Sequence, residues 1–154
     1  MRGFTLIELI ACILIAGVLA ALCGPLFTGT QPFDQRGYAE ELAAALRYAD
    51  GVAVATGCNV SFTVSAAGYT AQQQPAGAGN TCAAGGAYTQ QVVRADGTAL
   101  TDTPPSDANV VAGGTLIFGP AGQVSSWSGV LPASFVVGPV TLTVDSSSGF
   151  VTEQ

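Results

Sequence analysis

The chain has 154 residues, which fits one domain of modest size together with a separate segment. It carries 10 acidic residues against 4 arginines, with no lysine and no histidine, so its formal charge is −6 at pH 7 and its pI is near 4.1. This composition excludes catalysis by a Ser-His or Cys-His pair and metal binding through imidazole. It also argues against nucleic acid as a partner, because affinity for phosphate backbones comes mainly from Lys and Arg. We therefore expect neither enzymatic activity nor a cofactor.

The N-terminal part of the chain is an apolar segment, from Phe4 to Phe27, in which Glu8 is the only charged residue. As a helix, roughly 24 residues at about 1.5 Å each would reach about 36 Å, which exceeds a bilayer core of about 30 Å. The carboxylate would cost about 2.5 to 3.5 kcal/mol at the membrane centre, whereas the Leu, Ile, Val and Phe side chains contribute on the order of 4 to 8 kcal/mol in total. The segment is therefore predicted to span a membrane despite Glu8.

Glu8 is the candidate functional residue of this segment, because a carboxylate within a membrane span is kept at an energetic cost. It lies one helical turn after Phe4. If the chain were cut after Gly3, the new α-ammonium group of Phe4 would carry the charge that the carboxylate needs. Such an ion pair could form within one chain or between neighbouring chains.

The same residues resemble a known signal. Gly3 followed by Phe4-Thr5-Leu6-Ile7-Glu8, and then a long apolar helix with Pro25 near its end, is similar to the class III signal of type IV pilins and type II secretion pseudopilins. The resemblance implies cleavage between Gly3 and Phe4 by prepilin peptidase, N-methylation of Phe4, and a role for Glu8 in the assembly of subunits into a filament. It also implies, as partners, other pilins or pseudopilins, an inner-membrane platform protein and membrane lipid.

Three other interpretations of this segment stay open. A secretory signal peptide has about 7 to 15 apolar residues followed by a small-residue cleavage site, whereas this segment is longer and contains an acid. Leu9-Ile10-Ala11-Cys12 looks like a lipoprotein cleavage box, but few apolar residues precede it. A plain single-span anchor, with Glu8 present by chance, is the third. The N-terminal residue of the mature protein separates these interpretations.

The four cysteines fall into two pairs of different kinds. Cys12 and Cys23 both lie in the apolar segment, close to three helical turns apart, and are expected to pack as small apolar side chains. Cys58 and Cys82 lie in the remainder of the chain, where a secreted context favours a disulfide. This bond would close a loop of about 25 residues and contribute roughly 3 kcal/mol. The alternative is two buried free thiols.

The apolar helix is predicted to break near residues 24–33, because Pro25 lacks an N–H group and turn-forming residues follow it. A second helix should start with Asp34 as its N-cap and end at about Thr56, with Gly57 in the C′ position. Its apolar residues recur at steps of three and four and form one stripe that can lie on a sheet. The stripe consists of Tyr38, Leu42, Ala45, Leu46, Ala49, Val52 and Ala53.

From residue 59 onward the apolar period changes to two, which predicts antiparallel strands joined by turns. The predicted strands are residues 59–65, 69–74, 88–94, 115–118, 123–127, 135–137, 140–144 and 150–152. Residues 101–109 are predicted to be an irregular loop. Its Asp102, Asp107 and Asn109 offer oxygen ligands of the kind that Ca²⁺ prefers, but their spacing matches no EF-hand pattern. We therefore expect a solvated acidic loop and no metal site.

The part of the chain after the apolar segment resembles a second known group. Its layout is similar to that of the minor pseudopilin H and FimT-like group. The layout consists of a helix with Arg47-Tyr48-Ala49 and Val52-Ala53-Val54-Ala55, then Cys58 and a hairpin, then Ile117-Phe118-Gly119-Pro120-Ala121-Gly122, and finally Leu142-Thr143-Val144 and Ser148-Gly149-Phe150-Val151. Within this group, residues 33–69 most resemble the minor pilin MshC of the mannose-sensitive haemagglutinin pilus. The resemblance implies an α+β, type IV pilin-like fold.

Together these features predict four parts: a leader (1–3), a transmembrane and assembly helix (4–27), a linker with an amphipathic helix (28–57) and a β-rich periplasmic head (58–154). The predicted function is that of a minor pilin or pseudopilin, first anchored in the bacterial inner membrane by one span and then incorporated into a pilus or secretion pseudopilus. A major subunit is the alternative within the same class. A membrane-anchored periplasmic binding module that never joins a filament is the alternative from another class.

Overall fold

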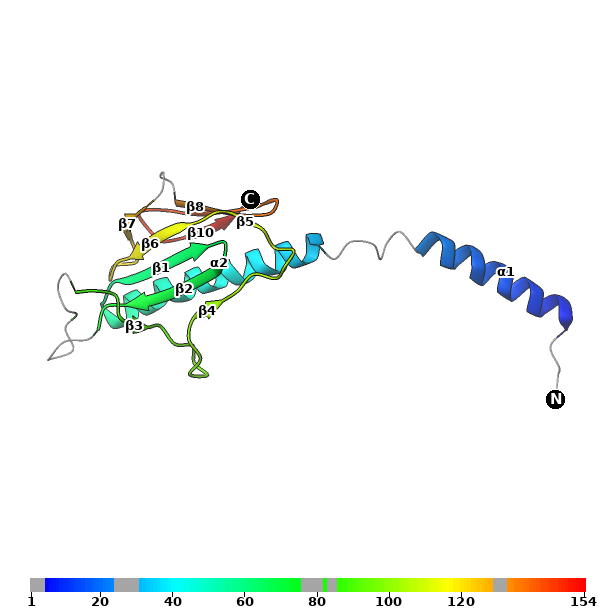
Figure 1. Ribbon diagram of the computed structural model, residues 1–154, viewed down its shortest axis with the longest axis horizontal. Helices are drawn as coiled ribbons and strands as arrows, with labels where there is room; N and C mark the ends of the chain where they lie inside the picture. Colours follow the sequence, from blue (N-terminus) through cyan, green and yellow to red (C-terminus); the bar gives the residue numbers. More distant parts are fainter. Residues whose placement is uncertain (1–4, 24–30, 76–81, 83–85, 129–132) are drawn as a thin grey trace. The chain divides into compact units, whose positions relative to one another are not determined.

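The computed structural model describes residues 5–23, 31–75, 82, 86–128 and 133–154. The chain divides into two compact units, residues 1–30 and residues 31–154. The first unit contains the helix α1, and the second, which we call the head, contains the helix α2 and the strands β1 to β10 (Figure 1). The predicted α+β class, with two helices and an antiparallel head, is confirmed.

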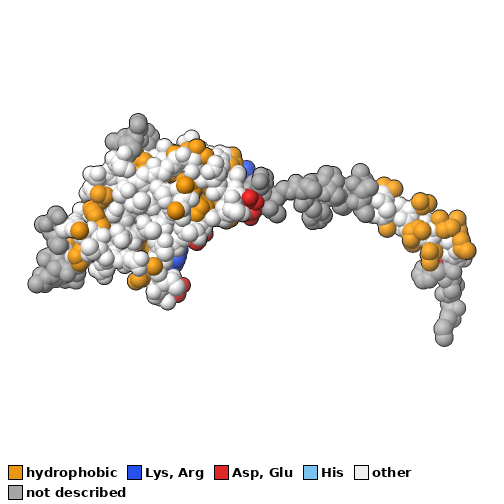
Figure 2. Space-filling model, viewed as in Figure 1, with side chains coloured by type: hydrophobic (Ala, Val, Ile, Leu, Met, Phe, Trp, Pro, Cys, Tyr) orange, Lys and Arg blue, Asp and Glu red, His pale blue; other side chains and the backbone are white. Residues whose placement is uncertain are grey.

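Helix α1 spans Leu6–Cys23 and is apolar on all sides. Its large apolar side chains are exposed, from Leu6 at 79% to Ile10 at 39% (Figure 2). Within the described part of the chain, no helix is both long enough and apolar enough to cross a membrane. The predicted span of residues 4–27 extends beyond the described residues at both ends.

Helix α2 spans Gln31–Thr56, so it starts earlier than predicted. The predicted break at residues 24–33 is wrong for its last three residues, because Pro32 sits in the first helical turn, where a missing N–H group breaks no intrahelical bond. Asp34 consequently lies in the first turn and is not the N-cap. The C-terminal end is as predicted, since Gly57 follows the helix with φ of +67°. Pro25 lies outside the described residues.

The first sheet of the head has the strand order β3-β2-β1-β6-β7, and β4 also pairs with β2. Its neighbouring strands are antiparallel, and the hairpin predicted from the alternation of residues 59–74 is formed by β1 and β2. The strand predicted at residues 88–94 is much shorter, because only Gln90 and Gln91 pair as a strand. The strands are β1 Val60–Ser65, β2 Gly68–Gln73, β3 Gln90–Gln91, β4 Thr101–Asp102, β6 Gly114–Phe118 and β7 Val124–Trp127.

The second sheet has the order β10-β9-β8-β5 and is also antiparallel. A backbone hydrogen bond of 3.0 Å from Val124 N–H to Ser146 C=O joins the start of β7 to the turn after β9. Strand β5 was not predicted, because three residues are too few to show an alternating pattern. The strands are β5 Val110–Ala112, β8 Ala133–Val137, β9 Val140–Val144 and β10 Val151–Glu153.

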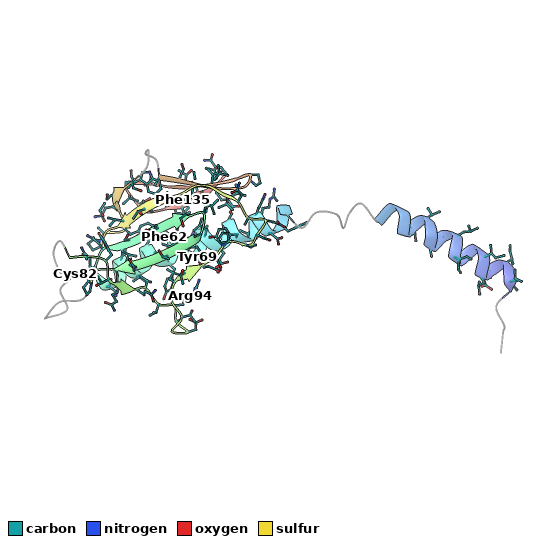
Figure 3. All side chains as sticks on the ribbon, viewed as in Figure 1. Phe62, Tyr69, Cys82, Arg94 and Phe135 are labelled. Atoms are coloured by element: carbon teal, nitrogen blue, oxygen red, sulfur yellow. A yellow bond between two sulfur atoms is a disulfide. The ribbon has the colours of Figure 1, made fainter. Side chains whose placement is uncertain are left out.

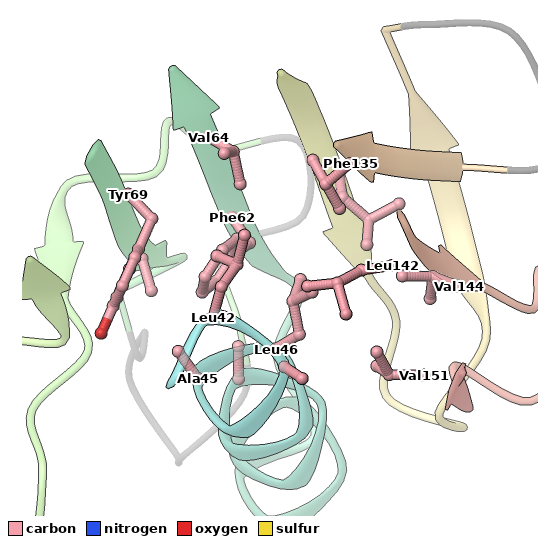
Figure 4. Packing of buried hydrophobic residues seen from close by; sticks show 14 of the residues in the cluster. Leu42, Ala45, Leu46, Phe62, Val64, Tyr69, Phe135, Leu142, Val144 and Val151 are labelled. Carbon is pink, nitrogen blue, oxygen red and sulfur yellow. The ribbon is translucent and has the colours of Figure 1, made fainter. Parts of the chain in front are cut away.

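The core of the head lies where α2 packs on both sheets. Leu42 and Leu46 of α2 point at Phe62 of the first sheet and Leu142 of the second, and all four side chains are fully buried (Figure 4). Each such side chain contributes about 1.5 to 3 kcal/mol relative to an exposed one. The predicted apolar stripe of α2 is therefore confirmed, although Val52 at its edge is only partly buried.

A disulfide joins Cys58 and Cys82, as predicted, with their Cα atoms 5.4 Å apart. Cys58 follows the end of α2, and Cys82 belongs to the connection between β2 and β3 (Figure 3). The bond closes a loop with a sequence separation of 24, for which the loss of unfolded-chain entropy contributes about 3 kcal/mol. The alternative of two free thiols is thus wrong.

Candidate functional site

Glu8 lies in the first turn of α1, at the third helical position. Its N–H group donates to the carbonyl oxygen of Thr5 at 3.1 Å and lies 3.4 Å from the Thr5 hydroxyl oxygen. Thr5 is therefore the N-cap, and the spacing Thr5-x-x-Glu8 is that of a capping box. A carboxylate at this position also interacts favourably with the positive end of the helix dipole. The Thr5-x-x-Glu8 spacing is a signal that the sequence itself contains.

The apolar surface of α1 is suited to hydrophobic contacts with lipid or with other apolar helices. A helix that is apolar on every side needs lipid or neighbouring helices around it. Cys12 is exposed on this surface, so it does not pack against its own chain. The side chain of Cys23 lies outside the described part of the structure, as do Gly3 and Phe4, where cleavage and methylation are predicted.

The head contains a chain of polar contacts that no sequence pattern indicated. The hydroxyl group of Tyr69 donates to Glu41 Oε1 at 2.9 Å and accepts from Arg94 Nη2 at 2.9 Å. Arg94 Nη1 donates to the carbonyl oxygen of Ala99 at 2.9 Å, and Arg94 Nη2 lies 3.9 Å from Glu41 Oε1. Tyr69 and Arg94 lie on the same side of the head (Figure 3), and the hydroxyl group of Tyr69 points away from the apolar cluster (Figure 4).

The surroundings of this cluster raise the pKa values of Glu41, Tyr69 and Tyr38. Burial, followed by the hydrogen bond with Asp102, raises the pKa of Glu41, although Tyr69 and Arg94 oppose this shift. Burial and the hydrogen bond to Glu41 raise the pKa of Tyr69. Burial, together with the charges of Asp102 and Glu41, raises the pKa of Tyr38 to about 12. Both tyrosines are therefore hydrogen-bond donors at neutral pH.

Two cavities flank Glu41. One of about 290 Å³ is mostly apolar and is lined by Glu41, Ala44, Ala45, Tyr48, Tyr69, Arg94 and Leu100. The other, of about 260 Å³, is lined by Phe33, Asp34, Gly37, Tyr38, Glu41, Asp102, Thr103 and Pro105. Glu41 is the acid that both cavities share.

The predicted acidic loop is attached to α2 and is not freely solvated along its whole length. The carbonyl oxygen of Asp107 accepts from Gln35 Nε2 at 3.1 Å, and Asp102 is half-buried at β4. Asp102 Oδ1 accepts from the N–H group of Thr103 at 2.7 Å. Asn109 is exposed. In the described ranges, no group of three acidic, cysteine or histidine side chains is arranged to hold a metal ion.

Family models match both the N-terminal segment and the head of the chain. A family described as type II transport protein GspH matches residues 38–151, which is more than half of the 154 residues. The chain belongs to the GspH family. The prokaryotic N-terminal methylation motif matches residues 1–23. No curated protein and no solved structure gives a significant match to this GspH-family chain.

Membership in the GspH family makes the chain a pilin or pseudopilin subunit. The matched region contains Glu41, Tyr69, Arg94 and the strands of both sheets, so the polar cluster belongs to the GspH-type head. The methylation motif covers Gly3, Phe4 and Glu8, the residues on which the resemblance to prepilin signals was based. The narrower likeness to MshC stays a prediction.

Proposed function

We propose that this GspH-family protein is a minor subunit of a type II secretion pseudopilus or type IV pilus. The observation that carries the proposal is the exposed apolar helix α1, which lies within the methylation motif and precedes a GspH-type head. Such a helix is covered by lipid before assembly and by other subunits' helices afterwards. The role is structural, the first location is the bacterial inner membrane with the head in the periplasm, and the MshC-type pilus is one candidate machine.

The proposal includes processing. Prepilin peptidase cuts between Gly3 and Phe4 and methylates the new amine of Phe4, and Glu8 then docks to the N-terminus of a neighbouring subunit in the filament. A platform protein of the inner membrane is the further partner. The match of the methylation motif to residues 1–23 supports this sequence of events.

The first test is the intact mass and N-terminal sequence of the protein isolated from its native membrane. A chain that begins at methylated Phe4 supports processing. A chain that begins at Met1, or a lipid on Cys12, would favour the membrane-anchored binding module. The copy number of the chain in purified filaments then separates a minor subunit from a major one.

The role of Glu8 is tested with a variant that removes its negative charge and keeps the helix cap. Glu8→Gln removes the carboxylate, but Gln is also suited to the capping box that Thr5 begins. We expect normal cleavage. Incorporation into filaments should fall by about tenfold or more, because the N-terminal ammonium group of the neighbouring subunit is left without its charged partner. If this variant is incorporated as well as the wild type, the assembly role of Glu8 is disproved and only its capping role remains.

A further inference from the structure

The smaller cavity, at the N-terminal end of α2, is acidic. Its charged lining residues are Asp34, Glu41 and Asp102, and all three carry carboxylates. Figure 2 shows acidic side chains at the end of the head where α2 begins. Phe33 at this cavity is 78% exposed, so an apolar ring stands at the site beside the carboxylates.

Tyr38 provides a second observation that points to a ligand. Its side chain is only 3% exposed, and its hydroxyl oxygen has no hydrogen-bond partner among the described residues. Tyr38 lines the cavity together with Glu41 and Asp102, so this unpartnered hydroxyl group belongs to a residue of the acidic site. A buried hydroxyl group without a partner is unfavourable and is normally satisfied by a bound group.

The cation that contacts Glu41 makes its hydrogen bonds to other groups. Arg94 Nη2 lies 3.9 Å from Glu41 Oε1, but its hydrogen bonds go to Tyr69 and to the carbonyl oxygen of Ala99. Arg94 lines the other cavity and is not among the residues that line this one. Three carboxylates and no Lys or Arg line the smaller cavity, and Arg36 lies next to Gly37 as an exposed residue of α2. Two carboxylates so close together favour a shared cation or a shared proton.

We propose that this cavity, formed by Tyr38, Glu41 and Asp102, binds a basic side chain, Lys or Arg, of a partner protein. A guanidinium or ammonium group donates hydrogen bonds to both carboxylates and to the hydroxyl oxygen of Tyr38. The rings of Phe33 and Tyr38 offer faces for a cation–π contact. The site lies wholly within the head and does not depend on the proposed processing.

The size of the cavity selects a side chain over other cations. Its volume of about 260 Å³ is many times that of a water molecule, about 30 Å³, and slightly below the range of about 300 to 1,000 Å³ for small-molecule sites. A divalent ion would share this space with several water molecules, whereas the stem and head of a basic side chain can occupy it. The described residues also lack the three grouped ligands that a metal site needs.

The test uses the full-length protein in detergent micelles and ethylguanidinium chloride as the probe. The ring signals of Tyr38 are followed by NMR and assigned with the variant Tyr38→Phe. Ethylurea, which has nearly the same shape and no charge, is the matched control. We expect a saturable shift of the Tyr38 signals with ethylguanidinium, and binding weaker by about tenfold or more with ethylurea.

Two variants locate the binding. Asp102→Asn keeps the size of the side chain and should weaken ethylguanidinium binding by about tenfold. Glu40→Gln, which removes a charge from the exposed neighbour of Glu41, should leave binding unchanged. Equal responses to ethylguanidinium and ethylurea, or unchanged binding in Asp102→Asn, would overturn the proposal. So would saturation by Ca²⁺ at about a tenth of the ethylguanidinium concentration, because the site would then be a metal site.

Discussion

The hydroxyl group of Tyr69, a buried residue of β2, donates a hydrogen bond of 2.9 Å to Glu41 on α2. The same hydroxyl oxygen accepts from Arg94 at 2.9 Å. One side chain therefore connects the helix, the sheet and the segment after β3. The Tyr69 ring stacks on Phe62 with centroids 5.4 Å apart, which fixes the direction of the hydroxyl group.

Tyr69→Phe keeps the ring and removes the hydroxyl group. Arg94 Nη2 then loses an acceptor and Glu41 loses a donor, so we expect the free energy of unfolding to fall by about 1 to 3 kcal/mol. Urea denaturation followed by circular dichroism measures this loss. Tyr48→Phe is the control, because the Tyr48 hydroxyl group makes one exposed hydrogen bond, to the carbonyl oxygen of Val93. Equal losses in the two variants would contradict a special role for the Tyr69 contacts.

The disulfide gives a second prediction. Cys58→Ser together with Cys82→Ser should lower the free energy of unfolding by about 2 to 4 kcal/mol, because the unfolded chain regains the freedom of the closed loop. Thermal denaturation with and without reductant measures the effect. Reductant should lower the melting temperature of the wild type and leave that of the double variant unchanged. A wild type that is insensitive to complete reduction would disprove the stabilising role.

Two glycines with similar backbone angles give a matched pair. Gly57 and Gly149 have φ of +67° and +65°. A Cβ atom on Gly57 would meet nothing within 4 Å, whereas one on Gly149 would lie 2.5 Å from the Gly122 carbonyl oxygen and 3.0 Å from Asp50 Oδ1. Gly57→Ala should cost only the backbone strain of about 1 to 2 kcal/mol, and Gly149→Ala clearly more. Equal losses in urea denaturation would show that the turn at Gly149 relaxes freely.

Glu41 should make stability depend on pH. Its folded pKa is raised above the ordinary value of 4.5, so the stability it contributes is complete below that value and is lost as pH rises through the folded pKa. The ionisable residues that line the two cavities with it are Asp34, Asp102, Tyr38, Tyr48, Tyr69 and Arg94. Glu41→Gln removes this dependence, so the variant should gain stability relative to the wild type between about pH 4 and about pH 7.

The control for this experiment is Glu40→Gln, which removes the same charge from the exposed neighbouring position. Urea denaturation at both pH values gives the two differences in unfolding free energy. Equal pH-dependent shifts in both variants would contradict an effect of the contacts that Glu41 makes with Asp102, Tyr69 and Arg94.

The sequence predicted those elements whose pattern is long enough to read. The stripe from Tyr38 to Ala53 repeats over four helical turns, and the alternation of β1 and β2 covers a full hairpin. The start of α2 was misplaced because Pro32 breaks helices in their interior but not in their first turn. Strands of two or three residues, such as β4 and β5, contain no period and depend on pairing partners far along the chain.

The candidate sites differ in the same way. Glu8 could be singled out from its own neighbours, because a single acid in an apolar segment is a local signal. Glu41, Tyr69 and Arg94 come together only through the packing of α2 on the first sheet. Each of the three occurs in an ordinary amphipathic or polar context, so nothing in the local sequence indicates that they meet. The disulfide was predictable because only two cysteines lie outside the N-terminal segment.

The disulfide at the C-terminal end of α2 also defines a mechanical path through the head. A pull on Gln31 travels along α2 to Gly57 and reaches Cys58, where the covalent chain divides. One branch enters β1 directly, and the other passes through the sulfur atoms to Cys82, between β2 and β3. Tension is thus shared between two points of the first sheet, the start of β1 and the connection between β2 and β3, so β1 carries only part of the load.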